Sequence, residues 1–398
     1  MSPLFRTALV LGLLSAVGPF AIDMYLPALP RIAEDLGTTV AATQQTLTLY
    51  FIAFGVSQLV YGPMADQVGR KPPLYVGMAI FILGSIGCAL APTVGWLTAF
   101  RFLQGIGAAA VMVIPRAIIR DMHTGAAATR LMAMIMLVIS VSPMLAPLAG
   151  AGLVALGGWR VIFWVLCVAA ALSFALIALA QPETLPRDKR VPVNLRSLLR
   201  GARVLFSDPV FMGLTFVGGF GMASFFVFIA SASFVYSDAF GLSPVQFSLA
   251  FAVNGIGFFG ASQLAGPLGG RFGMVPVMRV AVMGFALFGC TLLALTLAGL
   301  GSLPVIISFL FLGNACLGLV IPTTMVMALD DHGDIAGLAS SLGGSLQMLA
   351  GGIMITLTAP FFDGTALPMA AAIAFCAVAA MVLALMVLPR VVIRPEAA

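Results

Sequence analysis

The sequence contains little charge and few of the residues that hold metal ions. Only 8% of its 398 residues are charged, whereas a soluble globular domain carries about 25%. Its two histidines have no ligand spacing and its five cysteines form no CxxC pair, so no metal or disulfide framework is indicated. The HExxH and Gly-x-Ser-x-Gly motifs of hydrolases are also missing. We therefore expect neither an enzyme nor a cofactor or metal site.

Long apolar runs make up most of the chain. Hydrophobic residues account for 61% of it, and its mean hydropathy is +1.13. About 20 apolar residues cross the hydrocarbon core as a helix, and lipid forces backbone groups to pair within the segment. The pattern predicts an all-α polytopic membrane protein with twelve transmembrane helices in two six-helix halves. The runs lie near residues 5–27, 43–65, 74–92, 96–119, 131–156, 160–180, 209–236, 245–269, 275–298, 303–328, 335–360 and 366–388.

The positions of the basic residues indicate which loops face the cytoplasm, because short cytoplasmic loops carry an excess of Lys and Arg. With an inside N-terminus, only Arg31 and Arg160 of the 19 basic residues fall in outer loops, and Arg101 falls inside a span. We therefore expect both termini to be cytoplasmic. The net charge of +5 then reflects this topology, and no nucleic-acid partner is expected.

The two halves carry traces of an internal duplication. The stretch GPMADQVGRKPP at 62–73 recurs as GPLGGRFGMVPV at 266–277, and VIP occurs in the fourth span of each half. Parallel repeats of this kind are typical of carriers that bind substrate near the midplane and rock one half against the other. We expect an N-terminal bundle at 1–180, a basic cytoplasmic linker at 181–206 and a C-terminal bundle at 207–398.

The linker contains a candidate amphipathic helix. Arg196, Arg200 and Arg203 follow i, i+4, i+7 spacing, while leucines gather on another face. This pattern is typical of a helix lying on an anionic inner leaflet. A plain solvated basic loop is the alternative.

Two ionisable residues stand well inside the spans of the first half, Asp23 and Arg101. Each costs at least about 2.5 kcal/mol to bury in a span, so each needs a partner or a purpose. Both lie roughly 6 to 9 Å from the outer boundary at about 1.5 Å per residue, with Gln104 one turn deeper than Arg101. Burial penalises the carboxylate and a nearby guanidinium favours it, so Asp23 could exchange a proton as the protein changes conformation. A static ion pair and interfacial snorkelling of Asp23 are the alternatives.

The second half has no comparable intramembrane acid and offers aromatic and amide side chains instead. Such a set suits a bulky, mostly apolar ligand, although phenylalanines at helical spacing more often serve in packing or face lipid. The candidates there are Phe225, Phe226, Asn254, Asn314 and Gln347.

Several motifs carry a family resemblance. GPMADQVGRKPP resembles the loop 2–3 signature of the major facilitator superfamily, and RFLQGIG at 101–107 resembles its span 4 motif. SPMLAPLAGAG at 142–152 is similar to the antiporter motif of span 5. With AIDMYLPALP at 21–30 and PET at 182–184, the set resembles the bicyclomycin/chloramphenicol resistance (Bcr/CflA) group of drug:proton antiporters.

The resemblance implies roles for particular residues. Asp23 and Arg101 would couple transport to protons, and Asp66 of the loop signature would face the start of span 11, where free backbone N–H groups favour an anion. Arg70 would pair with Asp121. The implied conformational latch consists of Gly62, Asp66, Gly69, Arg70 and Asp121, with the glycines permitting close approach and a tight turn. The implied antiporter motif consists of Pro143, Pro147 and Gly150, although Ser142 and Ala151 stand where the family often has glycine.

The resemblance also implies a function. We expect a proton-coupled antiporter of a bacterial inner membrane that exports small amphiphilic drugs, phenicol- or bicyclomycin-like, as a monomer. Its partners would be the drug, protons and the bilayer. The expected substrate-binding residues are Asp23, Tyr50, Arg101, Gln104, Phe225, Phe226, Asn254, Asn314 and Gln347. The alternatives are a transporter of a specific metabolite such as a sugar, nucleoside or amino-acid derivative, and a membrane sensor that does not transport.

Overall fold

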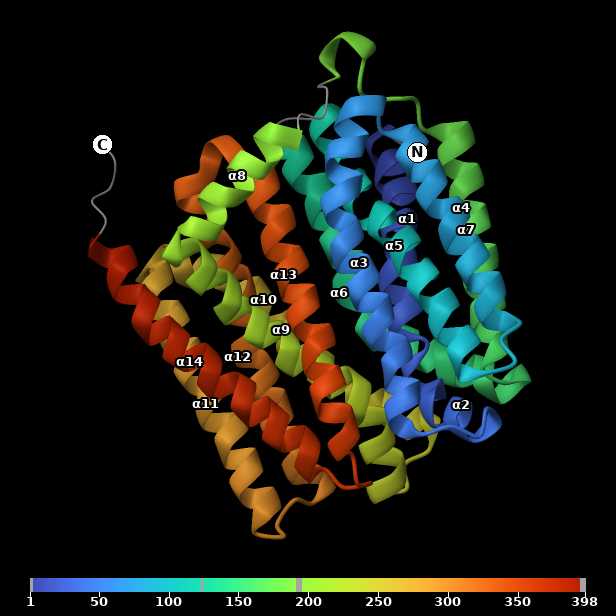
Figure 1. The fold of residues 1–398 in the computed structure, drawn as a ribbon, viewed down its shortest axis with the longest axis vertical. Coiled ribbons are helices and arrows are strands. Elements are labelled where there is room, and N and C mark those ends of the chain that lie inside the picture. The colour runs from blue at the N-terminus through green and yellow to red at the C-terminus, as the bar shows by residue number, and fades with distance from the viewer. Residues whose placement is uncertain (1–2, 123–124, 191–194, 394–398) are drawn as a thin grey trace. The chain divides into compact units, whose positions relative to one another are not determined.

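The computed structural model describes residues 3–122, 125–190 and 195–393 (Figure 1). No strand occurs within these ranges. The chain divides into two compact units, Met1–Asn194 and Leu195–Ala398. The division falls inside the segment expected to link the halves.

The first unit is built from seven α-helices and two short 3₁₀ turns. Its elements are α1 (Pro3–Asp23), η1 (Leu26–Ala28), α2 (Leu29–Asp35), α3 (Val40–Val68), α4 (Lys71–Ala89), α5 (Val94–Met122), α6 (Gly125–Gly157), α7 (Arg160–Ala180) and η2 (Arg187–Lys189).

The second unit is built in the same manner. Its elements are α8 (Leu195–Ser207), α9 (Pro209–Phe234), η3 (Val235–Ala239), α10 (Pro244–Phe272), α11 (Met274–Leu297), α12 (Leu303–Leu329), η4 (Asp330–Ile335), α13 (Ala336–Thr358), η5 (Ala359–Phe361) and α14 (Leu367–Ile393). Of these, η3 is a single π-helical turn.

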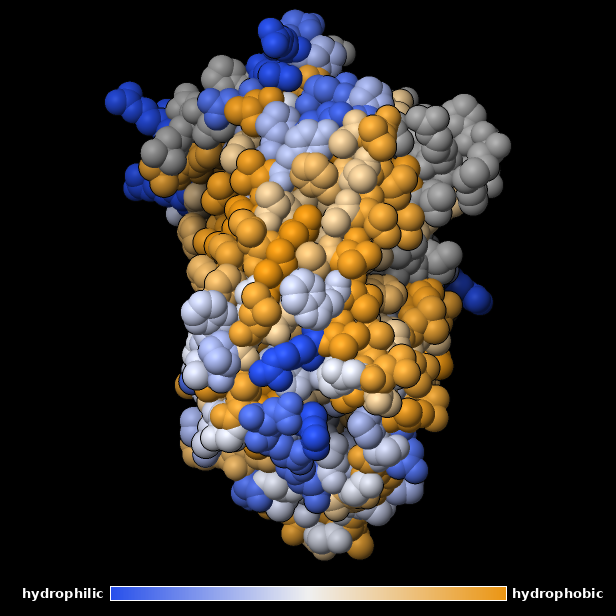
Figure 2. Space-filling model, turned by 90° about the vertical axis from the view of Figure 1, so that its right-hand side faces the viewer, coloured by the Kyte–Doolittle hydropathy of each residue, from blue (hydrophilic) through white to orange (hydrophobic). Residues whose placement is uncertain are grey.

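The expected membrane spans match these helices closely. Eleven helices in the described part of the chain are long and apolar enough to cross a membrane. The remaining expected span corresponds to α6, which has 33 residues and an apolar stretch at Val141–Gly157. On the face drawn in Figure 2, hydrophobic residues form a broad band and hydrophilic residues gather towards its two ends. The chain is therefore a multi-pass helical membrane protein.

The internal repeat is visible in local geometry. Helices α3 and α10 both contain 29 residues, and their first and last residues are separated by the same sequence offset as the repeated motif. Each helix ends at a glycine with positive φ, 101° at Gly69 and 84° at Gly273. Only glycine adopts this conformation without strain, which explains why both copies of the motif contain it.

One expectation about this motif is not met. A Cβ added at Gly62 would meet no atom within 4 Å. Close approach to a neighbour therefore does not explain the glycine at this position, whereas the turn explains Gly69. Gly62 occupies an interior turn of α3.

Candidate functional site

Arg101 of α5 is fully buried against α1 and α3. Its guanidinium carbon lies 4.5 Å from the ring centre of Tyr25 and 4.3 Å from that of Tyr50. Cation–π attraction of this kind is strongest where water is excluded. Nη1 also donates to the backbone oxygen of Ala21, at 3.1 Å. The rings of Tyr25 and Tyr50 and the Ala21 carbonyl of α1 thus hold the Arg101 guanidinium in place.

Hydrogen bonds extend from Arg101 across α5 to α4. Nη1 donates to Oε1 of Gln104 at 2.6 Å, and Nε2 of Gln104 donates to Oγ of Ser85 at 2.8 Å. The hydroxyl of Tyr50 donates to the backbone oxygen of Gly18 at 3.2 Å. The structure therefore brings three expected residues, Tyr50, Arg101 and Gln104, into one buried polar group.

Two donors of Arg101 are left without a protein acceptor. Nε and Nη2 are both buried, and neither has a hydrogen-bond partner in the described part of the chain. A buried guanidinium with free donors is costly, because it has lost water without replacing all of its hydrogen bonds. The arrangement suits an acceptor group on a ligand or an exchanging water molecule.

Asp23 lies at the end of α1 and is 5% exposed. Its Oδ2 accepts a hydrogen bond of 3.1 Å from Oγ of Ser142 on α6. Within the described residues no salt bridge joins Asp23 to Arg101, so the alternative of a static ion pair between them is not seen in this structure. The Arg101 guanidinium instead contacts the rings of Tyr25 and Tyr50 and the carbonyl of Ala21. It therefore reaches the same turn of α1 as Asp23 without contacting the carboxylate.

Close packing of α6 on the end of α1 positions Ser142. Pro143 and Pro147 lie inside α6, and a Cβ added at Gly150 would lie 2.8 Å from the carbonyl carbon of Met24 and nearer still to its oxygen. Only a residue without a side chain allows this approach. The antiporter-like stretch thus packs against the residue that follows Asp23.

A second polar network occupies the opposite end of the first unit. Arg70 donates from Nε to Oδ2 of Asp121 at 2.7 Å and from Nη2 to Oδ1 at 3.1 Å. Nη1 of Arg70 also donates to Asp66. Burial alone would lower the pKa of the Arg70 guanidinium, but its bonds to the carboxylates of Asp121 and Asp66 outweigh burial and raise it. The structure therefore places Arg70 beside Asp121, as expected; a contact of Asp66 with span 11 would join the two units and stays a prediction.

Glu183 connects this network to the segment after α7. Its Oε1 accepts from the backbone N–H of Arg70 at 2.9 Å and its Oε2 from that of Lys71 at 3.0 Å. A carboxylate at the start of α4 satisfies free N–H groups and complements the helix dipole. Burial by itself would raise the pKa of Glu183, but hydrogen bonds from the backbone of Lys71, Leu185 and Arg70 lower it overall.

The candidates of the second unit are spread over several helices. Phe225 stacks on Phe258 with ring centres 4.8 Å apart, and Phe226 contacts Gly351. Nδ2 of Asn254 donates to the backbone oxygen of Ala250 at 3.1 Å. Much of each phenylalanine surface is thus taken up by packing within the unit.

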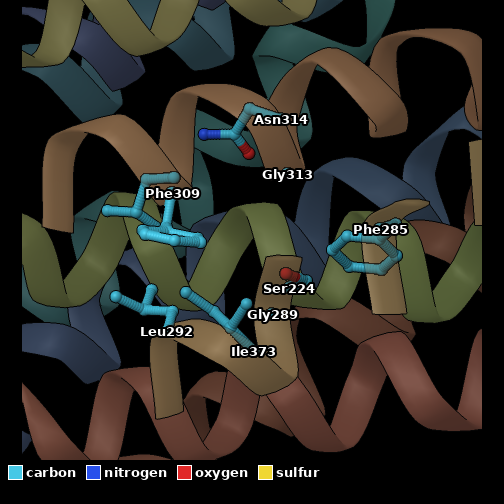
Figure 3. A pocket seen from close by; sticks show the side chains of 9 residues that line it. Ser224, Phe285, Gly289, Leu292, Phe309, Gly313, Asn314 and Ile373 are labelled. Carbon is cyan, nitrogen blue, oxygen red and sulfur yellow. The ribbon is translucent and has the colours of Figure 1, made fainter. Parts of the chain in front are cut away.

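Gln347 and Asn314 are also mainly internal. The Gln347 amide lies against Gly218 and is 8% exposed. Asn314 lines a small cavity together with Ser224 and Phe285 (Figure 3), and its Nδ2 has no partner in the described part of the chain. The cavity has a volume of about 10 Å³, which is room for about one water molecule. None of the other four candidates of this unit lines it.

Several residues of these sites were not singled out from the sequence. Ser142 was noted only as a departure from a family pattern, although an intramembrane hydroxyl is a natural partner for a buried carboxyl. Tyr25 was quoted within a motif without a role, and Glu183 only as part of PET. Arg116, which the charge pattern assigned to an inner loop, lies inside α5 with a buried Nε.

Comparisons with known proteins agree with this architecture. The Major Facilitator Superfamily model matches residues 11–355. The chain is 36% identical over 366 residues to the uncharacterized MFS-type transporter YdgK of Bacillus subtilis, covering 92% of this chain and 90% of the relative. It is 32% identical over 374 residues to a bicyclomycin resistance protein homolog of Haemophilus influenzae, covering 94% of each.

A solved structure agrees at the level of the fold. A D-xylose–proton symporter superposes with a TM-score of 0.77 over 97% of both chains at 16% identity. Helix number, the repeated motif and the match to most of the chain therefore lead to one assignment. The chain belongs to the Major Facilitator Superfamily, and its relatives support the resemblance to the Bcr/CflA group.

Proposed function

We propose that the chain is a proton-coupled antiporter that exports small amphiphilic drugs, phenicol- or bicyclomycin-like, by alternating access. The observation that carries this proposal is Asp23, a buried carboxyl held by Ser142 and lying on the same turn of helix that Arg101 reaches. An intramembrane carboxyl of this kind is a functional site unless a partner neutralises it. The name of the Haemophilus influenzae relative supports drug efflux as the physiological direction.

Proton and drug would compete in this scheme. When Asp23 is ionised, the Ser142 hydroxyl donates to it. A drug with acceptor atoms would use the free Nε and Nη2 donors of Arg101, which have no protein partner among the described residues. Protonation of Asp23 removes one negative charge from the site and changes the electric field at the Asp23 carboxyl and the Arg101 guanidinium. Alternating access then exposes the carboxyl to each side of the membrane in turn.

The remaining residues are assigned by the same proposal. Tyr50 and Gln104 complete the drug site in the N-terminal bundle, residues 1–180. The C-terminal bundle, residues 207–398, contributes aromatic and amide side chains, and residues 181–206 link the two. These contributing residues are Phe225, Phe226, Asn254, Asn314 and Gln347.

Two further motifs would control the gates. The latch residues would hold the cytoplasmic gate shut through the Arg70 network, and the Pro143, Pro147 and Gly150 stretch would seal α6 on α1 against proton leak. We further propose that the protein works as a monomer in a bacterial inner membrane with both termini in the cytoplasm. The latch residues are Asp66, Gly69, Arg70 and Asp121; Gly62, which no neighbour approaches, is not among them.

Asp23→Asn tests the coupling role, because it removes the titrating group while keeping the size of the side chain. We expect it to abolish drug efflux driven by a pH gradient in proteoliposomes, with normal membrane insertion. Asp35→Asn is the matched control, since Asp35 lies 36% exposed in an ion pair with Arg31 at the same end of the unit. The coupling role is refuted if Asp23→Asn transports drug against its gradient as well as the parent chain.

A further inference from the structure

Helix α8 begins the second unit and has a fixed position next to a membrane span. One residue, Asp208, separates α8 from α9, where it caps the first turn by accepting from Val210 N–H at 2.8 Å. The helix contacts both α9 and α13, and Figure 1 shows it running across the ends of these helices. Its 13 residues are about 20 Å long and join through Asp208 to the start of α9, a helix long and apolar enough to span a membrane.

Only part of the apolar surface of α8 is covered by protein. Gly201 and Leu205 are buried, and Gly201 packs against Leu338 of α13. Leu199 and Phe206 are 62% and 52% exposed. They are seven residues apart and so lie on one line along the helix. At about 100° per residue this line lies roughly 130° around the helix from the buried Gly201–Leu205 face, so the protein does not cover it.

The polar surface of α8 carries one sign of charge. Its sequence, LRSLLRGARVLFS, contains three arginines and no acidic residue. Arg200 and Arg203 are exposed, and at about 100° per residue they lie on one side of the Leu199–Phe206 line, Arg203 about 50° and Arg200 about 110° from it. An apolar line with basic side chains next to it is the pattern of a helix that lies in a membrane interface with its cations at the headgroups.

We propose that α8 is a binding surface for anionic phospholipids, with Leu199 and Phe206 among the acyl chains and Arg200 and Arg203 at the headgroup phosphates. The lipid leaflet on this side is the cytoplasmic one by the distribution of basic residues. Arginine donates in a planar fork that matches phosphate oxygens. This surface belongs to the second unit and the Asp23 site to the first, and the proposal does not depend on what the protein transports. It also gives the chain an attachment to lipid at the point where its second unit begins.

The test measures lipid binding to the full-length protein in neutral detergent. Native mass spectrometry compares the equilibrium constants for phosphatidylglycerol and phosphatidylcholine. An arginine near an anionic surface contributes on the order of a five-fold change in affinity, so Arg200→Gln with Arg203→Gln should weaken phosphatidylglycerol binding about 30-fold. Phosphatidylcholine binding should change little. Leu199→Gln with Phe206→Gln should weaken the binding of both lipids.

A matched control removes the same charge elsewhere in the unit. Arg271 and Arg279 are exposed, on α10 and α11, and their replacement by Gln should leave most of the phosphatidylglycerol preference. The proposal is overturned if this control loses as much preference as the α8 variant, or if the α8 variant binds phosphatidylglycerol like the parent. Should the α8 variant not fold, the parent chain still decides: its preference for phosphatidylglycerol must fall as salt rises, and a salt-independent preference overturns the proposal.

Discussion

Substitution of Gly150 by alanine tests the close packing of α6 on α1. The added methyl group would lie 2.8 Å from the carbonyl carbon of Met24 and nearer still to its oxygen, so α6 must move by more than about 0.6 Å to bring both atoms to ordinary contact distance. The contact atoms belong to the backbone, which cannot rotate away. Overpacking of this kind costs about 1 to 3 kcal/mol. A glycine-to-alanine change in a helix also gains about 1 kcal/mol of helix propensity.

Gly152 supplies the matched control, because it lies in the same helix and an added Cβ there meets no atom within 4 Å. Both substitutions carry the same gain in helix propensity, so their difference isolates the steric cost. We expect Gly150→Ala to be less stable than Gly152→Ala by about 1 to 3 kcal/mol. Reversible unfolding of the detergent-solubilised protein measures this difference.

The same pair of variants tests the proposed seal. A displacement of more than about 0.6 Å in the direction away from α1 would lengthen the 3.1 Å hydrogen bond from Ser142 to Asp23 beyond useful range. Proteoliposomes with Gly150→Ala should therefore leak protons faster and transport drug less efficiently, while those with Gly152→Ala should behave like the parent. Equal stability and equal leak for the two variants would refute the reasoning.

Three further predictions concern neighbouring groups. Ser142→Ala removes the donor to Asp23 and should reduce coupled efflux, whereas Ser142→Thr keeps a hydroxyl and should retain it; equal efflux from both would contradict this role. Arg101→Lys loses the guanidinium contacts with both tyrosine rings and should lower the free energy of unfolding by about 1 to 3 kcal/mol, as measured by denaturant titration. Glu183→Gln should destabilise the end of the first unit that holds Arg70 near neutral pH, and the difference from the parent should shrink in acid. Because the folded-state pKa of Glu183 is lowered, its stabilising effect is present above the unfolded value of about 4.3 and is lost as pH falls through the folded value; a difference that persists unchanged at lower pH would contradict this account.

The sequence by itself determined the fold class and the positions of the helices. A chain in lipid must pair its backbone groups within each segment, so every long apolar run becomes a helix whatever its neighbours are. This explains why the run at 160–180 coincides with α7 and the run at 275–298 lies within one residue of α11. The first run, expected to end near residue 27, lies in a candidate span that continues to Asp35; within it α1 ends at Asp23 and is followed by η1 and α2.

Some side-chain contacts could also be predicted, either from short motifs or from close spacing in the sequence. The pairing of Arg70 with Asp121 was expected only from the resemblance of GPMADQVGRKPP to the loop 2–3 signature of the superfamily, and the structure shows it. Asp66 is four residues from Arg70, a spacing that brings side chains together on one side of a helical turn.

Only the tertiary structure decided which side chain meets Asp23. Depth in the membrane follows from counting residues, and on that basis Arg101 and Asp23 were correctly placed near the same end. The rotation of each helix about its axis depends on how α1, α3, α5 and α6 pack together. It cannot be obtained by counting residues along one segment. That packing directs Arg101 to Tyr25 and Tyr50 and brings the Ser142 hydroxyl to the carboxylate.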